Sequence, residues 1–295
     1  MTASSGAPAI SGVRYTLLAL VFCHLWSGAF VAVKIGLASS PPLFLMASRF
    51  LIAGALLLAW AWASSRRMPA TAGEWGSIAL LGLLNHAIYL SLTAIALRHL
   101  SAGMGAIFAS TNPLMLALVA PWFLGERLTG RKVAGLVIAF GGVLWVMVSR
   151  VGPDNQPSAM ALLLFSIMFL VAGTIVFKRI RPDQDLVVLN AGQLFVAGVA
   201  LIVPSVLLEP LDTVRLTASF LATQLYLIAG VSWVAMLIWF WLLRHGDATR
   251  ASAWFFLNPV IGVFLGATLL GEPLGAHDFL GAATVALGIY LVQRG

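Results

Sequence analysis

Long apolar runs constrain this chain more than any other feature. Ten runs of roughly 20 residues follow one another, each bounded by charged residues, proline or glycine. Because lipid offers no partner to an exposed backbone group, such runs cross a bilayer only as helices when they lack strict alternation. The chain is therefore expected to be an all-α integral membrane protein with ten transmembrane helices. The expected spans are residues 15–38, 42–63, 75–96, 102–124, 131–149, 158–178, 185–208, 217–243, 248–270 and 276–293.

The composition agrees with a membrane protein that has no sizeable soluble domain. Of 295 residues, 61% are hydrophobic and only 9% are charged. The net charge of +7 does not indicate nucleic acid as a partner, because the basic residues lie in short turns between the runs. The lone Cys23 supplies neither an internal disulfide nor a metal site, and we expect no metal or cofactor. The first run continues to about Ala38 without a cleavage site, which indicates a retained span rather than a signal peptide.

The distribution of Lys and Arg predicts the orientation. With ten spans, both termini lie on one side, together with the turns after the even-numbered spans. That side holds Arg14, Arg66, Arg67, Arg127, Arg131, Lys132, Lys178, Arg179, Arg181, Arg244, Arg250 and Arg294. The opposite side holds Lys34, Arg98, Arg150 and Arg215. Because loops rich in Lys and Arg are retained on the cytoplasmic side, both termini are expected in the cytoplasm. The membrane is expected to be the bacterial inner membrane.

The chain also repeats itself at an offset of 146 residues. The recurring pairs are Leu97-Arg98-His99 with Leu243-Arg244-His245, Asn112-Pro113 with Asn258-Pro259, Gly125-Glu126 with Gly271-Glu272, Gly135 with Gly281, and Gly142 with Gly288. The expected halves are residues 1–150 and 151–295, with five spans each. Since five is odd, the second half enters the membrane from the opposite side. Inverted repeats of this kind are typical of secondary transporters, whose substrate site lies near the midplane between the halves.

These residues carry a family resemblance that covers nearly the whole chain. The first copy has Ala102, Asn112-Pro113, Leu124-Gly125-Glu126-Arg127-Leu128, Gly135 and Gly141-Gly142, and the second has Ala251, Asn258-Pro259, Leu270-Gly271-Glu272-Pro273-Leu274 and Gly281. The pattern resembles the EamA-type repeat of the drug/metabolite transporter superfamily, and Arg49-Phe50 after Pro42 also fits. The resemblance implies export of amino acids or related metabolites, and within the group the chain resembles aromatic amino acid exporters. Pro273 in place of Arg127, and the weak match of Gly173 to Gly28, are departures in the second copy.

Two proline positions mark the expected hinges. Pro113 and Pro259 fall in the middle of spans four and nine, where each removes a backbone donor and frees the carbonyl of Ala109 or Phe255. The preceding Asn112 and Asn258 are expected to bind those carbonyls or a substrate carboxylate. Either the kinks are purely structural, or they are hinges beside the substrate cavity.

Other candidate residues for substrate binding are polar or aromatic side chains within spans. Asn85, His86 and Tyr89 are expected to form a patch on one face of span three, since Asn85 and Tyr89 are four residues apart. The remaining candidates are His24, Trp239 and Trp254. All ten carboxylates lie at span ends or turns, so we do not expect proton coupling through a buried carboxylate. We expect a uniporter or a loosely coupled carrier instead. His24 and His86 are either proton carriers or neutral packing groups.

Four further charged or polar residues lie within spans or at their ends. Arg49, inside span two, either bonds to carbonyls or attracts an anionic group of the substrate, and Gln193 occupies a similar place in span seven. Lys34 is expected to reach toward the membrane surface. Glu126 follows a helix C-terminus, where the dipole disfavours an anion, and a tight turn with Arg127 is its expected role.

Rival functions remain open at the level of sequence. The same architecture fits an exporter of drugs or of metabolites such as nucleotide precursors, and a channel. A membrane-embedded enzyme is disfavoured because HExxH, GxSxG and phosphate-loop motifs are absent and no mid-span carboxylate could serve as an acid or base. We therefore expect no catalytic residues, a small molecule and the lipid bilayer as partners, and a monomer.

Overall fold

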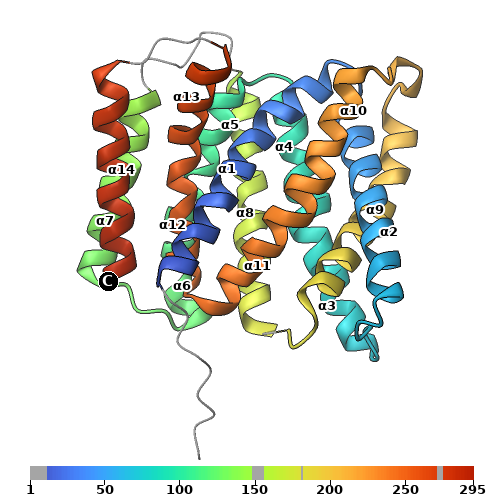
Figure 1. Cartoon of the computed structure of the whole chain (residues 1–295), viewed down its shortest axis with the longest axis horizontal. Helices are drawn as coiled ribbons and strands as arrows, with labels where there is room; N and C mark the ends of the chain where they lie inside the picture. Colours follow the sequence, from blue (N-terminus) through green and yellow to red (C-terminus); the bar gives the residue numbers. More distant parts are fainter. Residues whose placement is uncertain (1–11, 148–155, 181, 271–274) are drawn as a thin grey trace, which may run out of the picture.

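Long helices lie side by side and span one common layer in the computed structural model, which describes residues 12–147, 156–180, 182–270 and 275–295 (Figure 1). The described chain starts and ends at the same end of the bundle, the lower end in Figure 1. This end is the predicted cytoplasmic side, and the upper end is the predicted outer side. The shared end requires an even number of crossings, in agreement with ten.

The first five spans comprise seven α-helices and one π-helical segment. They are α1 (Gly12–Leu37), α2 (Pro42–Ala63), α3 (Ala72–Gly82) with η1 (Leu83–Ile88) and α4 (Tyr89–Leu97), α5 (Ala102–Ala109) with α6 (Asn112–Leu124), and α7 (Gly130–Met147). Spans three and four therefore each consist of consecutive shorter helical elements, whereas the amino-acid sequence predicts one helix for each span.

The second five spans repeat this pattern. They are α8 (Pro157–Ile180), α9 (Leu186–Leu208), α10 (Ala218–Leu225) with the π-helical η3 (Tyr226–Ala235) and α11 (Met236–His245), α12 (Ala248–Ala253) with the 3-10 turn η4 (Trp254–Phe256) and α13 (Leu257–Leu270), and α14 (Ala276–Arg294). A short 3-10 turn, η2 (Leu211–Thr213), precedes α10. Within the described residues, eight of the ten spans meet a strict criterion of length and hydropathy. The other two, α7 and α14, have 18 and 19 residues and lie parallel to the rest.

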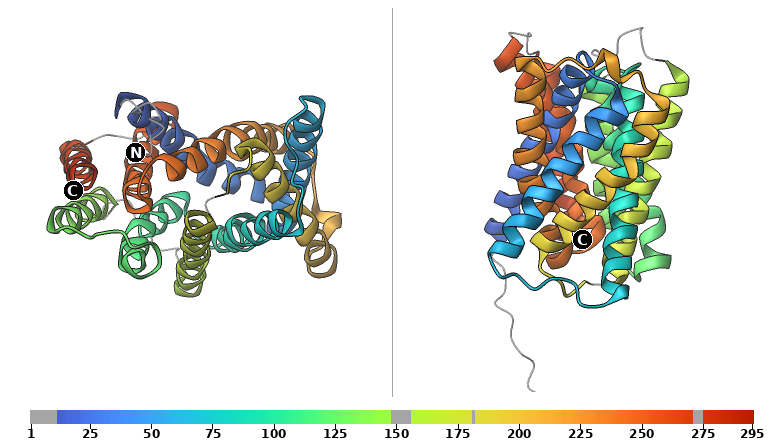
Figure 2. Two further views of the ribbon diagram at one scale, coloured as in Figure 1. Left: turned by 90° about the horizontal axis from the view of Figure 1, so that it is seen from below. Right: turned by 90° about the vertical axis from the view of Figure 1, so that its right-hand side faces the viewer.

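Equivalent helices of the two halves pack against each other at opposite ends of the molecule. The pair α7–α14 forms one end and the pair α2–α9 forms the other, while the remaining spans fill the space between (Figures 1 and 2). Glycines permit each close approach. A Cβ on Gly54 would collide with the backbone of Phe195, and a Cβ on Gly198 with the backbone of Leu51. The contacts are reciprocal, because Gly198 and Phe195 each follow their counterparts by 144 positions. This reciprocity confirms the inverted two-repeat architecture.

Two lysines make the same interaction in both halves. Lys34 donates from Nζ to the carbonyl of Leu97 at 2.7 Å, and Lys178 donates to the carbonyl of Leu243 at 3.0 Å. Each cation lies at the C-terminal end of a helix, where the helix dipole favours positive charge. Lys34 therefore has a defined helix-capping contact in addition to its expected position near the membrane surface.

Glu126 differs from its expected role because its carboxylate reaches another helix. Its Oε1 accepts from the backbone N–H of Ala248 at 2.6 Å, and its Oε2 accepts from the N–H and the hydroxyl of Thr249. The carboxylate thus caps the N-terminus of α12, where the dipole favours an anion. Glu209 does the same at the start of α2, accepting from the N–H groups of Leu43 and Phe44. Glu272, the counterpart of Glu126, lies outside the described residues.

The glycine contacts predict a sharp difference between two positions on α7. A Cβ on Gly135 would lie 2.6 Å from the carbonyl oxygen of Gly288, whereas a Cβ on Gly141 meets nothing within 4 Å. We expect Gly135→Val to lower the stability of the purified protein in detergent by about 1–3 kcal/mol, through overpacking of the α7–α14 contact.

Gly141→Val is the matched control, because it makes the same chemical change on the same helix. Its melting temperature, followed by tryptophan fluorescence, should stay close to that of the unmodified chain. Equal melting temperatures for the two variants would contradict the close contact between α7 and α14.

Candidate functional site

A small cavity lies between the two halves, near the middle of the bundle. Its lining includes Trp26 and Phe30 of α1, Arg49 of α2, Tyr89 and Thr93 of α4, and Val231 of η3. Its volume is about 20 Å³, which is room for about one water molecule. The cavity is thus nearly closed in this conformation, and a metabolite fits only after the surrounding helices part.

Spans three and eight both carry a π-helical segment beside the cavity. The wider turns of η1 and η3 shift the register of the side chains that follow, and such segments are frequent at functional sites. Glycines of spans one and six make room for them. A Cβ on Gly28 would collide with the Tyr226 hydroxyl, and a Cβ on Gly173 would collide with the Asn85 amide. The two glycines that match weakly in sequence therefore have similar roles.

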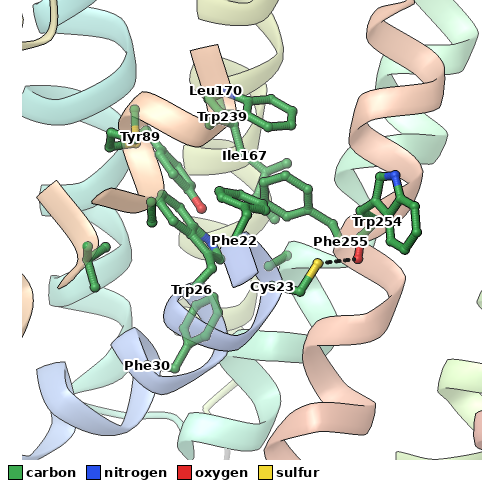
Figure 3. Close-up of a cluster of buried hydrophobic side chains, with 14 of the residues drawn as sticks. Phe22, Cys23, Trp26, Phe30, Tyr89, Ile167, Leu170, Trp239, Trp254 and Phe255 are labelled. Atoms are coloured by element: carbon green, nitrogen blue, oxygen red, sulfur yellow. Dashed lines mark hydrogen bonds between the residues drawn. The ribbon is translucent and has the colours of Figure 1, made fainter. Parts of the chain in front are cut away.

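Of the three residues expected to form one patch on span three, Tyr89 lines the cavity, whereas Asn85 and His86 do not. Tyr89 lines the cavity, and its hydroxyl lies beside the Trp26 indole (Figure 3). Asn85 instead donates from Nδ2 to Oε1 of Gln193 on α9, at 3.3 Å. Asn85 therefore contacts α9, whereas Tyr89 lines the cavity, and their joint role in substrate binding stays a prediction.

His86 is packed between helices rather than in the cavity. Its side chain is fully buried, and its ring lies 5.5 Å from the ring of Phe50. Neither ring nitrogen has a hydrogen-bond partner. The structure thus places His86 and Asn85 together at the contact of span three with α2 and α9, apart from the cavity lining.

Spans four and nine are interrupted at the two Asn-Pro pairs, as the prolines predict. The α-helix of span four stops at Ala109 and resumes at Asn112, and span nine contains η4 immediately before α13. The carbonyl of Phe255, which Pro259 frees, accepts from the hydroxyl of Ser110 at 3.2 Å. The break in one half is therefore satisfied by a side chain at the break in the other.

The helix α1 supplies further donors to the break in span nine. Ser27 donates from Oγ to the carbonyl of Asn258 at 3.1 Å, and Cys23 donates from Sγ to the carbonyl of Trp254 at 3.2 Å (Figure 3). The amides of Asn112 and Asn258, which were the expected donors, do not donate hydrogen bonds to these carbonyls. Both asparagines are fully buried, and neither amide nitrogen has a partner. At the break in span nine, hydroxyl and thiol groups bond to the carbonyls instead.

Three aromatic rings fill the bundle on the side of the cavity nearer the lower end in Figure 1. Phe22 stacks on Trp239 with 5.4 Å between ring centroids, and Trp239 meets Phe255 edge-on at 5.2 Å (Figure 3). We call Phe22, Trp239 and Phe255 the aromatic plug. Its members come from spans one, eight and nine. Trp239 lies eight residues beyond the cavity residue Val231, which is about 12 Å along a helix.

The positions equivalent to the aromatic plug carry small side chains. The lysine pair aligns spans one and six at an offset of 144, which makes Ser166 the counterpart of Phe22. The repeat at 146 makes Thr93 and Ala109 the counterparts of Trp239 and Phe255. The hydroxyls of Ser166 and Thr93 lie 3.1 Å apart, so they contact each other as Phe22 and Trp239 do. The aromatic plug in one half thus corresponds to a contact between small side chains in the other half.

Two expected site residues lie away from the cavity. The side chain of His24 is exposed, on the face of α1 opposite to the buried Phe22 and Cys23. Trp254 is buried, but its indole points away from Phe255 and the aromatic plug (Figure 3). Their positions do not support direct contact with a ligand in this cavity, whereas Tyr89 lines it and Trp239 lies in the aromatic plug.

Sequence reasoning missed several residues around the cavity. The candidates from the sequence do not include Trp26, Phe30 and Thr93 of the lining, or Phe22 of the aromatic plug. A signal was present in the repeat, since aromatic residues in one half align with small residues in the other. This difference is hidden when the two halves are aligned at a single offset of 146 residues, because the first two spans of each half align at an offset of 144.

The chain matches a family model over almost its full length. The model is described as the EamA-like transporter family, and it matches twice, at residues 13–148 and 157–294. The two matches correspond to the two five-span repeats of the structure.

Several proteins with similar sequences are named as transporters. The uncharacterized transporter YvbV of Bacillus subtilis is 27% identical over 95% of this chain and 92% of its own length. The uncharacterized inner membrane transporter YedA of Escherichia coli strain K12 is 27% identical over 92% of this chain and 88% of its own length. A solved structure, described only as the crystal structure of a protein, has a TM-score of 0.79 at 20% identity and covers 96% of this chain and 98% of the other. This last likeness concerns the fold alone.

The unpartnered amides predict a test of the two helix breaks. We expect the double variant Asn112→Ala, Asn258→Ala to fold normally in detergent, because it removes buried polar groups that have no amide partner in the resting protein. If both amides bind substrate, uptake into proteoliposomes should fall roughly tenfold, about the loss expected for two hydrogen bonds. Undiminished uptake by a correctly folded double variant would remove both asparagines from the site.

Proposed function

This chain belongs to the EamA-like transporter family, and on that premise we propose that it exports small metabolites, foremost amino acids with aromatic or other neutral side chains, across the cytoplasmic membrane. It is a multi-pass membrane protein, and both the family and the relatives are named as transporters rather than enzymes. The observation that carries the proposal is the cavity lined by α1, α2 and α4 of the first repeat and by η3 of the second, within a fold of two inverted repeats. The proposed carrier works by alternating access, as a uniporter or with loose coupling.

The aromatic plug suggests which step the structure represents. With Phe22, Trp239 and Phe255 in contact, the lower end in Figure 1 is closed beneath the cavity. In the proposed cycle, these rings separate when the cavity opens toward that end. The pairs α2–α9 and α7–α14 are tightly packed through glycine and serve as the fixed parts, while the inner spans move between them.

The chemistry of the cavity supports a substrate with an apolar body. Trp26, Phe30 and Tyr89 provide aromatic faces, and Arg49 provides a cation. Within the described residues, the cavity lining contains no carboxylate that could carry a proton. His86 is buried outside the lining and His24 is exposed, which supports transport without tight proton coupling.

The direct test is uptake into proteoliposomes of the purified chain, with a panel of labelled amino acids, with and without a pH gradient. We expect saturable uptake of aromatic and other neutral members, competed by one another and little changed by the gradient. Absence of uptake for every member would overturn the amino acid assignment and favour drugs or nucleotide precursors, which the same assay can examine by competition.

The histidines supply the control for coupling. His24→Ala and His86→Ala should both leave uptake near its original rate, because neither side chain lines the cavity. A loss that is confined to one variant, and that occurs only when a pH gradient is imposed, would identify that histidine as a proton carrier and contradict uniport.

A further inference from the structure

Arg49 is the one ionisable cation in the cavity lining, and it is almost fully buried. Its side chain is 1% exposed, and it lies in the middle of the packed bundle. Its Nε donates to the hydroxyl of Ser232 at 2.9 Å, and its Nη1 lies 3.9 Å from the sulfur of Met46, a weak acceptor. Its Nη2 has no hydrogen-bond partner. A guanidinium has five donors, and this one is far from satisfied.

Among the residues that the structure describes, no carboxylate forms an ion pair with Arg49. Within the described residues, every ion pair lies at a helix end or turn, and none includes Arg49. A buried cation without a counter-ion is costly in a membrane protein and calls for a compensating role. Phe50 contributes only a weak attraction, with the guanidinium carbon 5.1 Å from its ring centroid.

The other half of the molecule shows that the structural contact needs no charge. Gln193 lies 144 positions after Arg49, the offset that relates Gly54 to Gly198, so the two side chains are equivalent. Arg49 bonds to Ser232 in η3, and Gln193 bonds to Asn85 in η1. Each therefore joins its own helix to the π-helical segment of the opposite repeat. A neutral amide suffices for this contact at Gln193, which leaves the charge of Arg49 to another purpose.

The surroundings of Arg49 indicate the chemistry of a ligand. The rings of Trp26, Phe30 and Tyr89 line the same cavity, and Tyr89 and Thr93 are the lining residues that carry hydroxyls. One cation beside aromatic faces matches a molecule with one anionic group and an apolar body. A carboxylate pairs with a guanidinium through two parallel hydrogen bonds, and Arg49 has spare donors for them.

We propose that Arg49 is the anchor for the carboxylate of the transported molecule, so that the substrates are small organic carboxylates with an apolar or aromatic body. This inference rests on the proposed function as a carrier and specifies which part of an amino acid is recognised. The cavity of about 20 Å³ must widen before the carboxylate reaches the guanidinium. On binding, the substrate supplies the counter-ion that the described part of the chain does not give to Arg49.

The test compares carboxylates with their uncharged amide counterparts in proteoliposomes of the full chain. The probes are L-phenylalanine and 3-phenylpropionate, each set against its amide, as competitors of labelled L-phenylalanine uptake. We expect each carboxylate to compete about 10- to 100-fold better than its amide, the range for one hydrogen bond to a charged group. In Arg49→Gln, which copies the equivalent residue Gln193, this preference should disappear.

Two further variants separate recognition from folding and from surface charge. Arg49→Lys keeps the charge but not the paired donors, and should retain part of the preference. Arg98→Gln makes the same change at an exposed arginine near the end of α4 and should leave the preference intact. Each variant is first shown to elute from size exclusion as the unmodified chain does.

The outcomes distinguish this inference from the proposed function. Saturable uptake without a preference for carboxylates, or a preference that survives in Arg49→Gln, would overturn the anchor while leaving a carrier. Absence of saturable uptake for every probe and panel member would overturn the carrier and the anchor together. If Arg49→Gln does not fold, the preference of the unmodified chain and its reduction in Arg49→Lys decide the matter.

Discussion

Lipid cannot satisfy a backbone hydrogen bond, and the structure depends on how the chain meets this constraint wherever a helix stops. Backbone carbonyl and N–H groups at helix breaks and ends form hydrogen bonds with side chains from elsewhere in the sequence. Ser110 bonds to the carbonyl that Pro259 frees, and Cys23 bonds to the carbonyl just before it. Glu126 caps the start of α12. Because these partners come from different spans, satisfying the backbone also joins the spans into one body.

The joined body is symmetric in its backbone and asymmetric in its side chains. The glycine contacts of α2 with α9, and the lysine caps of α4 and α11, occur in both halves. The inner positions differ, since the residues of the aromatic plug have small equivalents in the repeat, namely Ser166, Thr93 and Ala109. A symmetric frame allows two related conformations, and unequal side chains favour one of them at rest. In our account, the bound substrate changes that balance, with Arg49 as the charge it meets.

Much of the fold could be predicted from the sequence, because it follows from periodic and repeated features. The apolar runs gave the ten spans, and the repeats at Asn112-Pro113 and Asn258-Pro259 located the breaks. The site was harder, since it depends on register. Asn85 contacts Gln193 while Tyr89 lines the cavity, and nothing in that stretch of sequence marks the π-helical segment η1 that precedes Tyr89. Partners such as Ser110 for Phe255 depend on tertiary contacts that no local pattern encodes. The orientation of the termini stays a prediction.

The central claim, that two inverted repeats exchange access around one cavity, can be tested by distance measurements between spin labels in liposomes. The background is Cys23→Ser, which removes the one cysteine and keeps a donor for the Trp254 carbonyl. One labelled pair, at His99 and Ser219, spans the upper end of the cavity in Figure 1, and its counterpart, at Gly73 and His245, spans the lower end; all four positions are exposed. With a saturating transported amino acid, the account predicts that the upper distance shortens while the lower distance lengthens. Two distances that stay constant, or that change in the same direction, would contradict it.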